Sequence, residues 1–357
     1  MMIPGKSLLP PVAMRVTALA AVIALLALDC AATAVHIPSA RELAGKSDIV
    51  AKVRVLSVKQ VSFESTRMPN GDVNEVISFE AQLQTIYVLT GELAPVATLR
   101  YQINNSGSLS ARVDAGTVRL LFLKQGTDAA SFADPVKSAL PADPISPVLA
   151  SQAPTFEERL RGEFLGALDS NDPEVVGASV AALGDLGLTN DETQKVAPFV
   201  SSPDRALAGD ALVALLKSGH YEYLNDAISY MCGDAPGDSK LISRQCRLKT
   251  VLCKITDPAV TVRLIGVMDS PAVDLRFSAA YALRNTKVRG AVPAFVKGLQ
   301  DSDVEVRYQC LMGLAETVEG EYAPEQGPSR ALFDKDETKY IRFWQDWWER
   351  EGKQQKW

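Results

Sequence analysis

Few residues in this chain have the types and spacing that catalysis requires. The sequence contains two histidines, His36 and His220, which leaves little for a catalytic triad or a histidine-rich zinc site. Residues 40–47, ARELAGKS, satisfy a relaxed phosphate-loop pattern. A phosphate loop must follow a buried strand and open a helix, whereas strand-like sequence follows this motif. We therefore expect a short surface helix that ends at Gly45.

Carboxylates recur where helices are expected to begin. They are Asp172, Glu174, Asp204, Asp274, Asp301 and Glu305. Capping and the helix dipole explain acids at such positions without acid–base chemistry. The sequence provides no coherent catalytic set, so we predict no catalytic residue, no metal site and no cofactor.

Two arginines and a group of tryptophans are candidates for partner binding. Arg276 and Arg307 occupy equivalent places in neighbouring copies of a repeat, so they either form a binding ridge or bond to helix-start acids such as Asp301. All four tryptophans lie in the last fourteen residues. Phe343, Trp344, Trp347 and Trp348 share one broad helical face. That face is either a cap over the last repeat or an exposed docking site for a partner.

The N-terminus has the layout of a cleaved secretory signal over residues 1–34. Lys6 and Arg15 precede the apolar residues 16–28, and small residues follow at 32–34. The apolar run is shorter than the roughly 20 residues that span a bilayer, so no membrane span is expected after cleavage. The sequence predicts a secreted or periplasmic protein. Cys30 offers the alternative of a lipoprotein, although Asp29 stands where the bacterial lipobox has a small residue.

Four cysteines lie in the second half of the chain, where export would permit disulfides. Cys232 ends an expected helix, residues 233–238 form a turn, and Cys246 lies about two turns into the next helix. A Cys232–Cys246 disulfide is therefore our first choice among the pairings. The spacing of Cys232, Cys246, Cys253 and Cys310 does not form a paired CxxC metal site. Buried thiols are the alternative, particularly for Cys310.

Residues 35–134 have the two-residue period of β-strands. Apolar residues alternate with polar ones in 49–55, 77–83 and 97–103, and residues 118–123 are almost continuously apolar. Four or five strands in this length suggest a small antiparallel barrel or sandwich. Five prolines then fall within residues 135–154, which we expect to be an extended linker.

Residues 155–351 contain a helical repeat, followed by a tail at 352–357. Leucines recur with spacings of 32, 37, 31 and 31 residues, at Leu183, Leu215, Leu252, Leu283 and Leu314. A period in the low thirties is typical of stacked helix pairs. Helix starts are predicted where a capping residue precedes proline, at 172–173, 202–203, 257–258 and 270–271.

This half resembles the HEAT-repeat family, in particular the short HEAT-like repeats of bacterial proteins, over about residues 155–350. The likeness is clearest in 273–283 and 304–314, where a valine, Arg276 or Arg307, small residues and a final leucine follow the family pattern. The resemblance implies paired antiparallel helices in a curved α-solenoid, with protein–protein binding as its usual role. Together with the strand pattern, it predicts a two-domain fold, a small antiparallel barrel or sandwich followed by an all-α solenoid. Residues 35–135 bear a fainter likeness to netrin-like, OB-type barrels, in 47–53, 88–91 and 120–123.

These features favour a non-enzymatic protein that binds or scaffolds another protein. The net charge is −6 and no basic patch is present, so nucleic acid is not an expected partner. One alternative is a hydrolase or lyase-like enzyme with its site between the β domain and the concave helical face. The other is a protease inhibitor acting through the β domain. The oligomeric state stays open.

Overall fold

A computed structural model describes residues 38–68, 73–104, 111–133, 138–142, 155–233, 238–318 and 327–357. Within it, Ser39–Trp357 forms one compact unit. The expected signal peptide, the lipoprotein cysteine Cys30 and His36 all lie outside the described residues.

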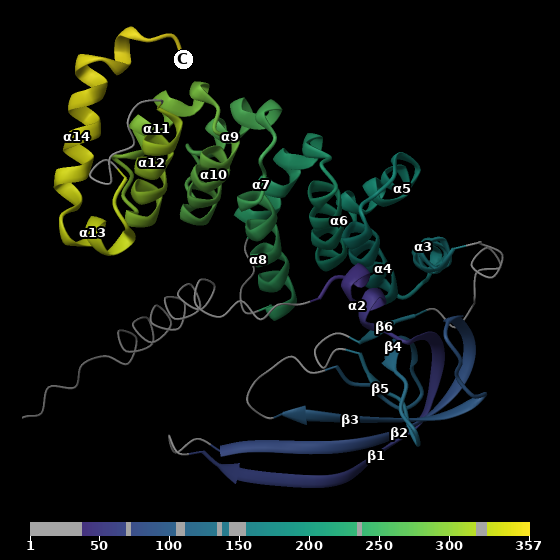
Figure 1. The fold of residues 1–357 in the computed structure, drawn as a ribbon. Coiled ribbons are helices and arrows are strands. Elements are labelled where there is room, and N and C mark those ends of the chain that lie inside the picture. Colours follow the sequence, from purple (N-terminus) through teal and green to yellow (C-terminus); the bar gives the residue numbers. More distant parts are fainter. Residues whose placement is uncertain are drawn as a thin grey trace, which may run out of the picture. The chain divides into compact units, whose positions relative to one another are not determined.

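The first part of this unit is a nearly closed antiparallel β-barrel (Figure 1). Its strands are β1 (Ile49–Arg67), β2 (Val73–Thr90), β3 (Val96–Asn104), β4 (Val118–Lys124), β5 (Ser131–Phe132) and β6 (Ala139–Pro141). The strand order is β3-β2-β1-β4-β5, and β6 pairs with β4. At the seam that closes the barrel beside β3, the Ala130 amide donates to the Thr98 carbonyl, and the Ala130 carbonyl accepts from the Arg100 amide. The two-residue periodicity thus correctly predicted the main strands.

The expected linker is partly strand. Residues 139–141 form β6, in which Leu140 pairs with Leu120 and Pro141 with Arg119. The strand forms because Leu140 is buried in the core, and Pro141 is tolerated at its last position because a terminal residue need not donate to the ladder. The linker prediction is wrong for these three residues, and 143–154 lie outside the described residues.

The second part is a helical repeat with two rows of helices (Figure 1). The longer helices, each in contact with the next, are α4 (Pro173–Leu186), α6 (Arg205–Lys217), α8 (Ser239–Cys253), α10 (Val273–Thr286) and α12 (Val304–Thr317). The shorter ones are α5 (Asn190–Val196), α7 (Leu224–Cys232), α9 (Thr261–Val267) and α11 (Val292–Gly298). Helix α3 (Phe156–Gly166) precedes the repeat, and α13 (Arg330–Lys335) and α14 (Glu337–Arg350) follow it.

The leucine series lies near the ends of the long helices, facing inward. All five leucines are buried, which is what a period in the low thirties requires when each repeat packs only on its neighbours. Of the four predicted helix starts, 172–173 opens α4 and 257–258 opens a 3-10 turn that leads into α9, whereas the other two are displaced. The hydroxyl groups of Ser202 and Ser270 accept hydrogen bonds from the backbone amides two residues later. Helices α6 and α10 therefore begin only at Arg205 and Val273.

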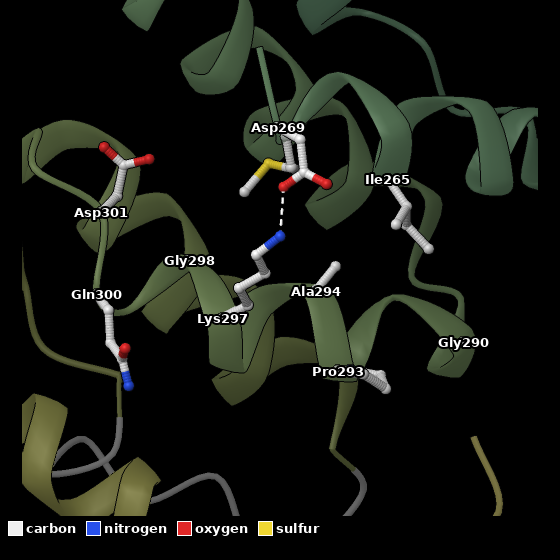
Figure 2. Close-up of a pocket in the computed structure, with 10 residues that line it drawn as sticks. Ile265, Asp269, Gly290, Pro293, Ala294, Lys297, Gly298, Gln300 and Asp301 are labelled. Carbon is white, nitrogen blue, oxygen red and sulfur yellow. Dashed lines mark hydrogen bonds and ion pairs between the residues drawn. The ribbon is translucent and has the colours of Figure 1, made fainter. Parts of the chain in front are cut away.

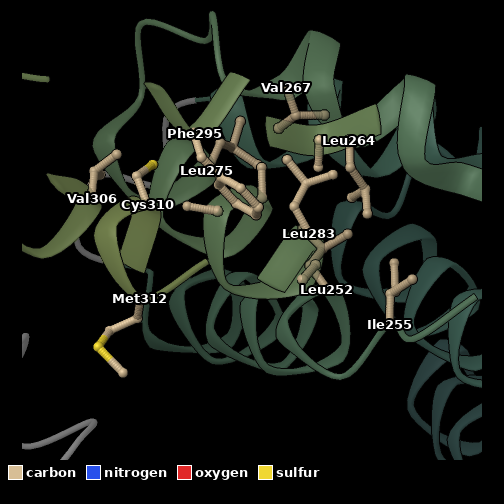
Figure 3. Close-up of a cluster of buried hydrophobic side chains, with 14 of the residues drawn as sticks. Leu252, Ile255, Leu264, Val267, Leu275, Leu283, Phe295, Val306, Cys310 and Met312 are labelled. Atoms are coloured by element: carbon tan, nitrogen blue, oxygen red, sulfur yellow. The ribbon is translucent and has the colours of Figure 1, made fainter. Parts of the chain in front are cut away.

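Close packing in the repeat depends on small residues. Figure 3 shows Phe295, Cys310 and Leu275 among the apolar side chains that fill the space between helices. Gly298 of α11 lies directly against Cys310 of α12, where a Cβ atom would overlap with the sulfur. Burial raises the pKa of the Cys310 thiol far above its ordinary value, so this cysteine stays a neutral, apolar part of the core.

The barrel and the repeat share a hydrophobic core. Val50 and Phe122 of the barrel cluster with Leu160 and Phe164 of α3. Within this contact Lys52 of β1 forms an ion pair with Glu163 of α3, and both side chains are almost completely buried. The alternation in β1 predicted that Lys52 would point away from the barrel core. It does so, but α3 covers that side of the strand.

We predict that replacing one partner of this ion pair destabilises the protein strongly. Lys52→Met leaves Glu163 as a buried charge without its ammonium, and the expected loss is about 3–5 kcal/mol of unfolding free energy in urea denaturation. The double variant Lys52→Met/Glu163→Leu should recover most of that loss. Lys124→Met, which removes the half-exposed pair with Asp48, is the control and should cost at most about 1 kcal/mol. Equal losses for Lys52→Met and Lys124→Met would contradict the prediction.

A second prediction concerns helix packing. Gly298→Ala should destabilise the repeat by about 1–3 kcal/mol because the added methyl group overlaps with Cys310. Gly266→Ala in α9, where no atom lies within 4 Å of the new Cβ, should instead be neutral or stabilise by up to about 1 kcal/mol. Thermal unfolding followed by circular dichroism compares the two. Rescue of Gly298→Ala by Cys310→Ala tests the stated cause.

Candidate protein-binding surface

Each of the two repeat arginines connects its helix to the next helical unit along the chain. Arg276 of α10 donates through Nε and Nη2 to the two carboxylate oxygens of Asp301, at 2.7 and 3.0 Å. Arg307 of α12 pairs with Glu337 of α14 and donates to the Asp301 carbonyl at 2.7 Å. Hydrogen bonds to these carboxylates raise the pKa of both guanidinium groups. Burial tends to raise the pKa of the Asp301 carboxyl group, yet the hydrogen bonds from Arg276 hold that pKa below its usual range. Both guanidinium groups are thus engaged inside the repeat.

The terminal aromatic helix covers the end of the repeat. Trp344 is 3 % exposed and Trp347 is 8 % exposed, within the same core cluster as α12. Trp348 is only partly buried and forms a triangle of rings with Trp347 and Trp357, whose centroids each lie about 6.3 Å from its own. Of the three candidate tryptophans, Trp348 offers the most surface to a partner. The expected tail is also ordered, since Trp357 donates to the Gly352 carbonyl at 2.8 Å.

The predicted disulfide is not formed. Cys232 and Cys246 are both exposed thiols. The residue of α8 that faces the end of α7 is Gln245, whose side-chain amide donates to the carbonyls of Met231 and Gly233. Cys246 follows Gln245 and is rotated by about 100° around the helix, so its side chain does not take that facing position.

The remaining sequence motifs have structural roles. Residues 40–46 form helix α2, whose capping box joins Ser39 and Glu42 and whose Leu43 is buried against the repeat. The helix runs one residue past the predicted end at Gly45, and it is not confined to the surface. His220 accepts or donates a 2.8 Å hydrogen bond with Thr193, which joins two neighbouring repeats.

A shallow pocket of about 530 Å³ lies between α9 and α11 in the helical half. Figure 2 shows Lys297 reaching from α11 toward Asp269, with Nζ 2.5 Å from the carboxylate. Asp301, also at this pocket, is the partner of Arg276. The charges here are neutralised by one another, and both Lys297 and Asp269 are well exposed to solvent. This pocket therefore has no unmatched charge to attract a ligand.

The most unusual surface is on the barrel, where the β1–β2 hairpin runs on beyond β4 (Figure 1). Strand β4 pairs with β1 only over residues 49–54, but β1 continues to Arg67. In this extension Phe63 lies opposite Ile77, and Ile77 lies opposite Ile103 of β3. Cross-strand partners share a face of the sheet. One apolar row therefore continues the core-facing side of the barrel into solvent.

We call this surface the extension face and define it as Val61, Phe63, Ile77, Phe79, Tyr101 and Ile103. Val61 is 51 % exposed and Phe63 is 53 % exposed. Phe79 and Tyr101 stack with ring centroids 5.3 Å apart, and Phe132 of β5 lies 5.2 Å from Tyr101. A pocket of about 460 Å³ is lined by these three rings and Val61, and also by the polar residues Ser78, Arg100, Gln102 and Ser131. The extension face thus combines exposed apolar side chains with a hollow between aromatic rings.

Sequence reasoning did not identify this surface. The alternation in residues 77–83 and 97–103 correctly placed Ile77, Phe79, Tyr101 and Ile103 on one face. It did not reveal that the covering strand is too short. The mismatch lies in the lengths of the strands, because β4 ends at Lys124 after seven residues whereas β1 continues through Val61 and Phe63 to Arg67.

None of the helices in the described part of the chain combines the length and apolar character needed to cross a membrane. No cluster of three or more histidine, cysteine, aspartate or glutamate residues in the same part has the arrangement to hold a metal ion.

Comparison with known proteins identifies helical repeat proteins as structural neighbours. No family model and no curated protein sequence matches the chain. One solved neighbour is an engineered protein, with a TM-score of 0.32, 14 % identity, and coverage of 52 % of this chain and 96 % of its own. Two designed armadillo repeat proteins follow, at 15 % identity and TM-scores of 0.30 and 0.29. Each covers 48 % of this chain and 90 % or 89 % of its own, and the first was solved with the peptide (KR)4.

Proposed function

We propose that this chain is an exported, non-enzymatic protein that binds another protein through the extension face of its barrel. The observation that carries the proposal is the row of apolar side chains that runs past the end of β4. Half-exposed Val61 and Phe63 cost solvation free energy unless a partner covers them. Contiguous apolar surface of this kind marks interaction sites in soluble proteins.

The chemistry of the surface indicates the kind of partner. The pocket between Phe79, Tyr101 and Phe132 accommodates an aromatic or branched aliphatic side chain. Tyr101 does not compete for polar groups of the partner, because its hydroxyl donates to the Val113 carbonyl at 3.3 Å. The partner we propose is therefore a protein segment that presents an apolar anchor with few charges around it.

The helical repeat serves in this proposal as a support for the barrel. The contact between the barrel and α3 contains the packed side chains of Val50, Phe122, Leu160 and Phe164. Lys52 and Glu163 neutralise each other within it. These contacts hold the base of the hairpin and leave its far end available for binding.

A display library of random peptides selected on the full chain tests the proposal. We expect enriched peptides to carry aromatic or branched aliphatic residues. Phe63→Asp should weaken their binding about tenfold or more, since it places a charge within the extension face.

Val262→Asp is the matched control, because Val262 is 81 % exposed on α9 and lies outside the extension face. Its affinity for the peptides should equal that of the wild type. Selected peptides that bind Phe63→Asp and the wild type equally well would place the binding site elsewhere.

A further inference from the structure

The outer edge of β1 is a long strand edge available for pairing. Strand β2 occupies one side of β1 along its whole length, and β4 occupies the other only over residues 49–54. Val55 then bonds to the backbone of Gly116 and Thr117. Within the described ranges, no strand pairs with this edge over residues 56–67. Such an edge is a template for adding another strand.

A bulge places two opposite charges on the same side of this strand. The register shifts between Gln60 and Ser62, so Val61 is an extra residue. Lys59 lies opposite Glu80, and Glu64 lies opposite Val76. Residues 76 and 80 are on one face of β2, so Lys59 and Glu64 also share a face, the one opposite the extension face.

The charges on this face alternate across the sheet. Arg100 of β3 bonds to Glu80 of β2 at 3.0 Å, and Glu80 lies opposite Lys59 of β1. A further strand paired with the outer edge of β1 would continue this alternation of charge if it presented an acid opposite Lys59. Antiparallel pairing of β1 with a second β1, centred between Val61 and Ser62, places Glu64 there. The same two-fold symmetry places Lys59 of the second copy opposite Glu64 of the first.

We propose that two copies of this chain form a dimer by antiparallel pairing of residues 57–66 of β1. In this register Gln60 lies opposite Phe63 of the second copy, so the two extension faces join on one side of a continuous sheet. Isolated charges on an edge strand normally oppose such pairing. Here each lysine meets a glutamate, so the same charges favour this register and select a second copy as the partner. The inference does not depend on the proposed function, because it uses the strand edge and the opposite face.

Sedimentation velocity of the full chain over a concentration series tests the dimer. Lys59→Glu places two glutamate pairs across the two-fold axis, and Glu64→Lys places two lysine pairs there. Each single variant should raise the dimer dissociation constant about tenfold or more. Arg67→Glu is the control on the same strand, because Arg67 lies opposite the uncharged Leu56 in this register, and it should dimerise as the wild type does.

Charge exchange gives a readout that misfolding cannot imitate. The double variant Lys59→Glu/Glu64→Lys should dimerise again, and an equimolar mixture of the two single variants should form heterodimers. A wild type that stays monomeric at every concentration overturns the proposal. Single variants that dimerise like the wild type, or a double variant that fails to recover, overturn it equally. Peptide binding to the extension face is measured separately, so failure of one inference is distinguishable from failure of the other.

Discussion

The buried ion pair between Lys52 and Glu163 lies where two parts of the fold with different periodicities meet, and it restricts how they can pack. Removing an ammonium or a carboxylate from water costs several kcal/mol unless an opposite charge meets it. Lys52 is in the middle of the sheet, with β2 on one side and β4 on the other. Glu163 comes from the helix that precedes the repeat. Each charge is tolerated only while barrel and helix stay in contact, which makes this contact specific as well as apolar.

The helical repeat uses the same principle in a less buried form. Arg276 and Arg307 each bond to an acid that belongs to the next helical unit along the chain. Between the rows, glycines such as Gly298 allow helices to approach until their side chains interlock. The last repeat has no successor, and Trp344 and Trp347 of α14 cover its apolar surface. Polar bonds define the register of the repeats, and apolar packing provides most of their stability.

The barrel differs because the apolar face of β1, β2 and β3 is longer than strand β4, which closes the barrel beside them. Strands β1, β2 and β3 continue their apolar alternation beyond the point where β4 ends. A core that continues into solvent is costly in an isolated protein. Both inferences about binding follow from this mismatch, one from the exposed face of the extension and one from its edge. In the helical half, by contrast, Arg276 and Arg307 are both paired with acids.

The sequence by itself determined the elements of this protein. A two-residue period specified the strands, and the leucine spacing specified the stacked helices, because local periodicity is a property of the chain. Tertiary structure decided the role of individual side chains. Lys52 became buried because α3 covers it, and Cys232 and Cys246 stayed apart because Gln245 has the facing position on α8. Phe63 became exposed because β4 ends too early. Burial depends on which distant segment arrives at a face, and no local pattern contains that information.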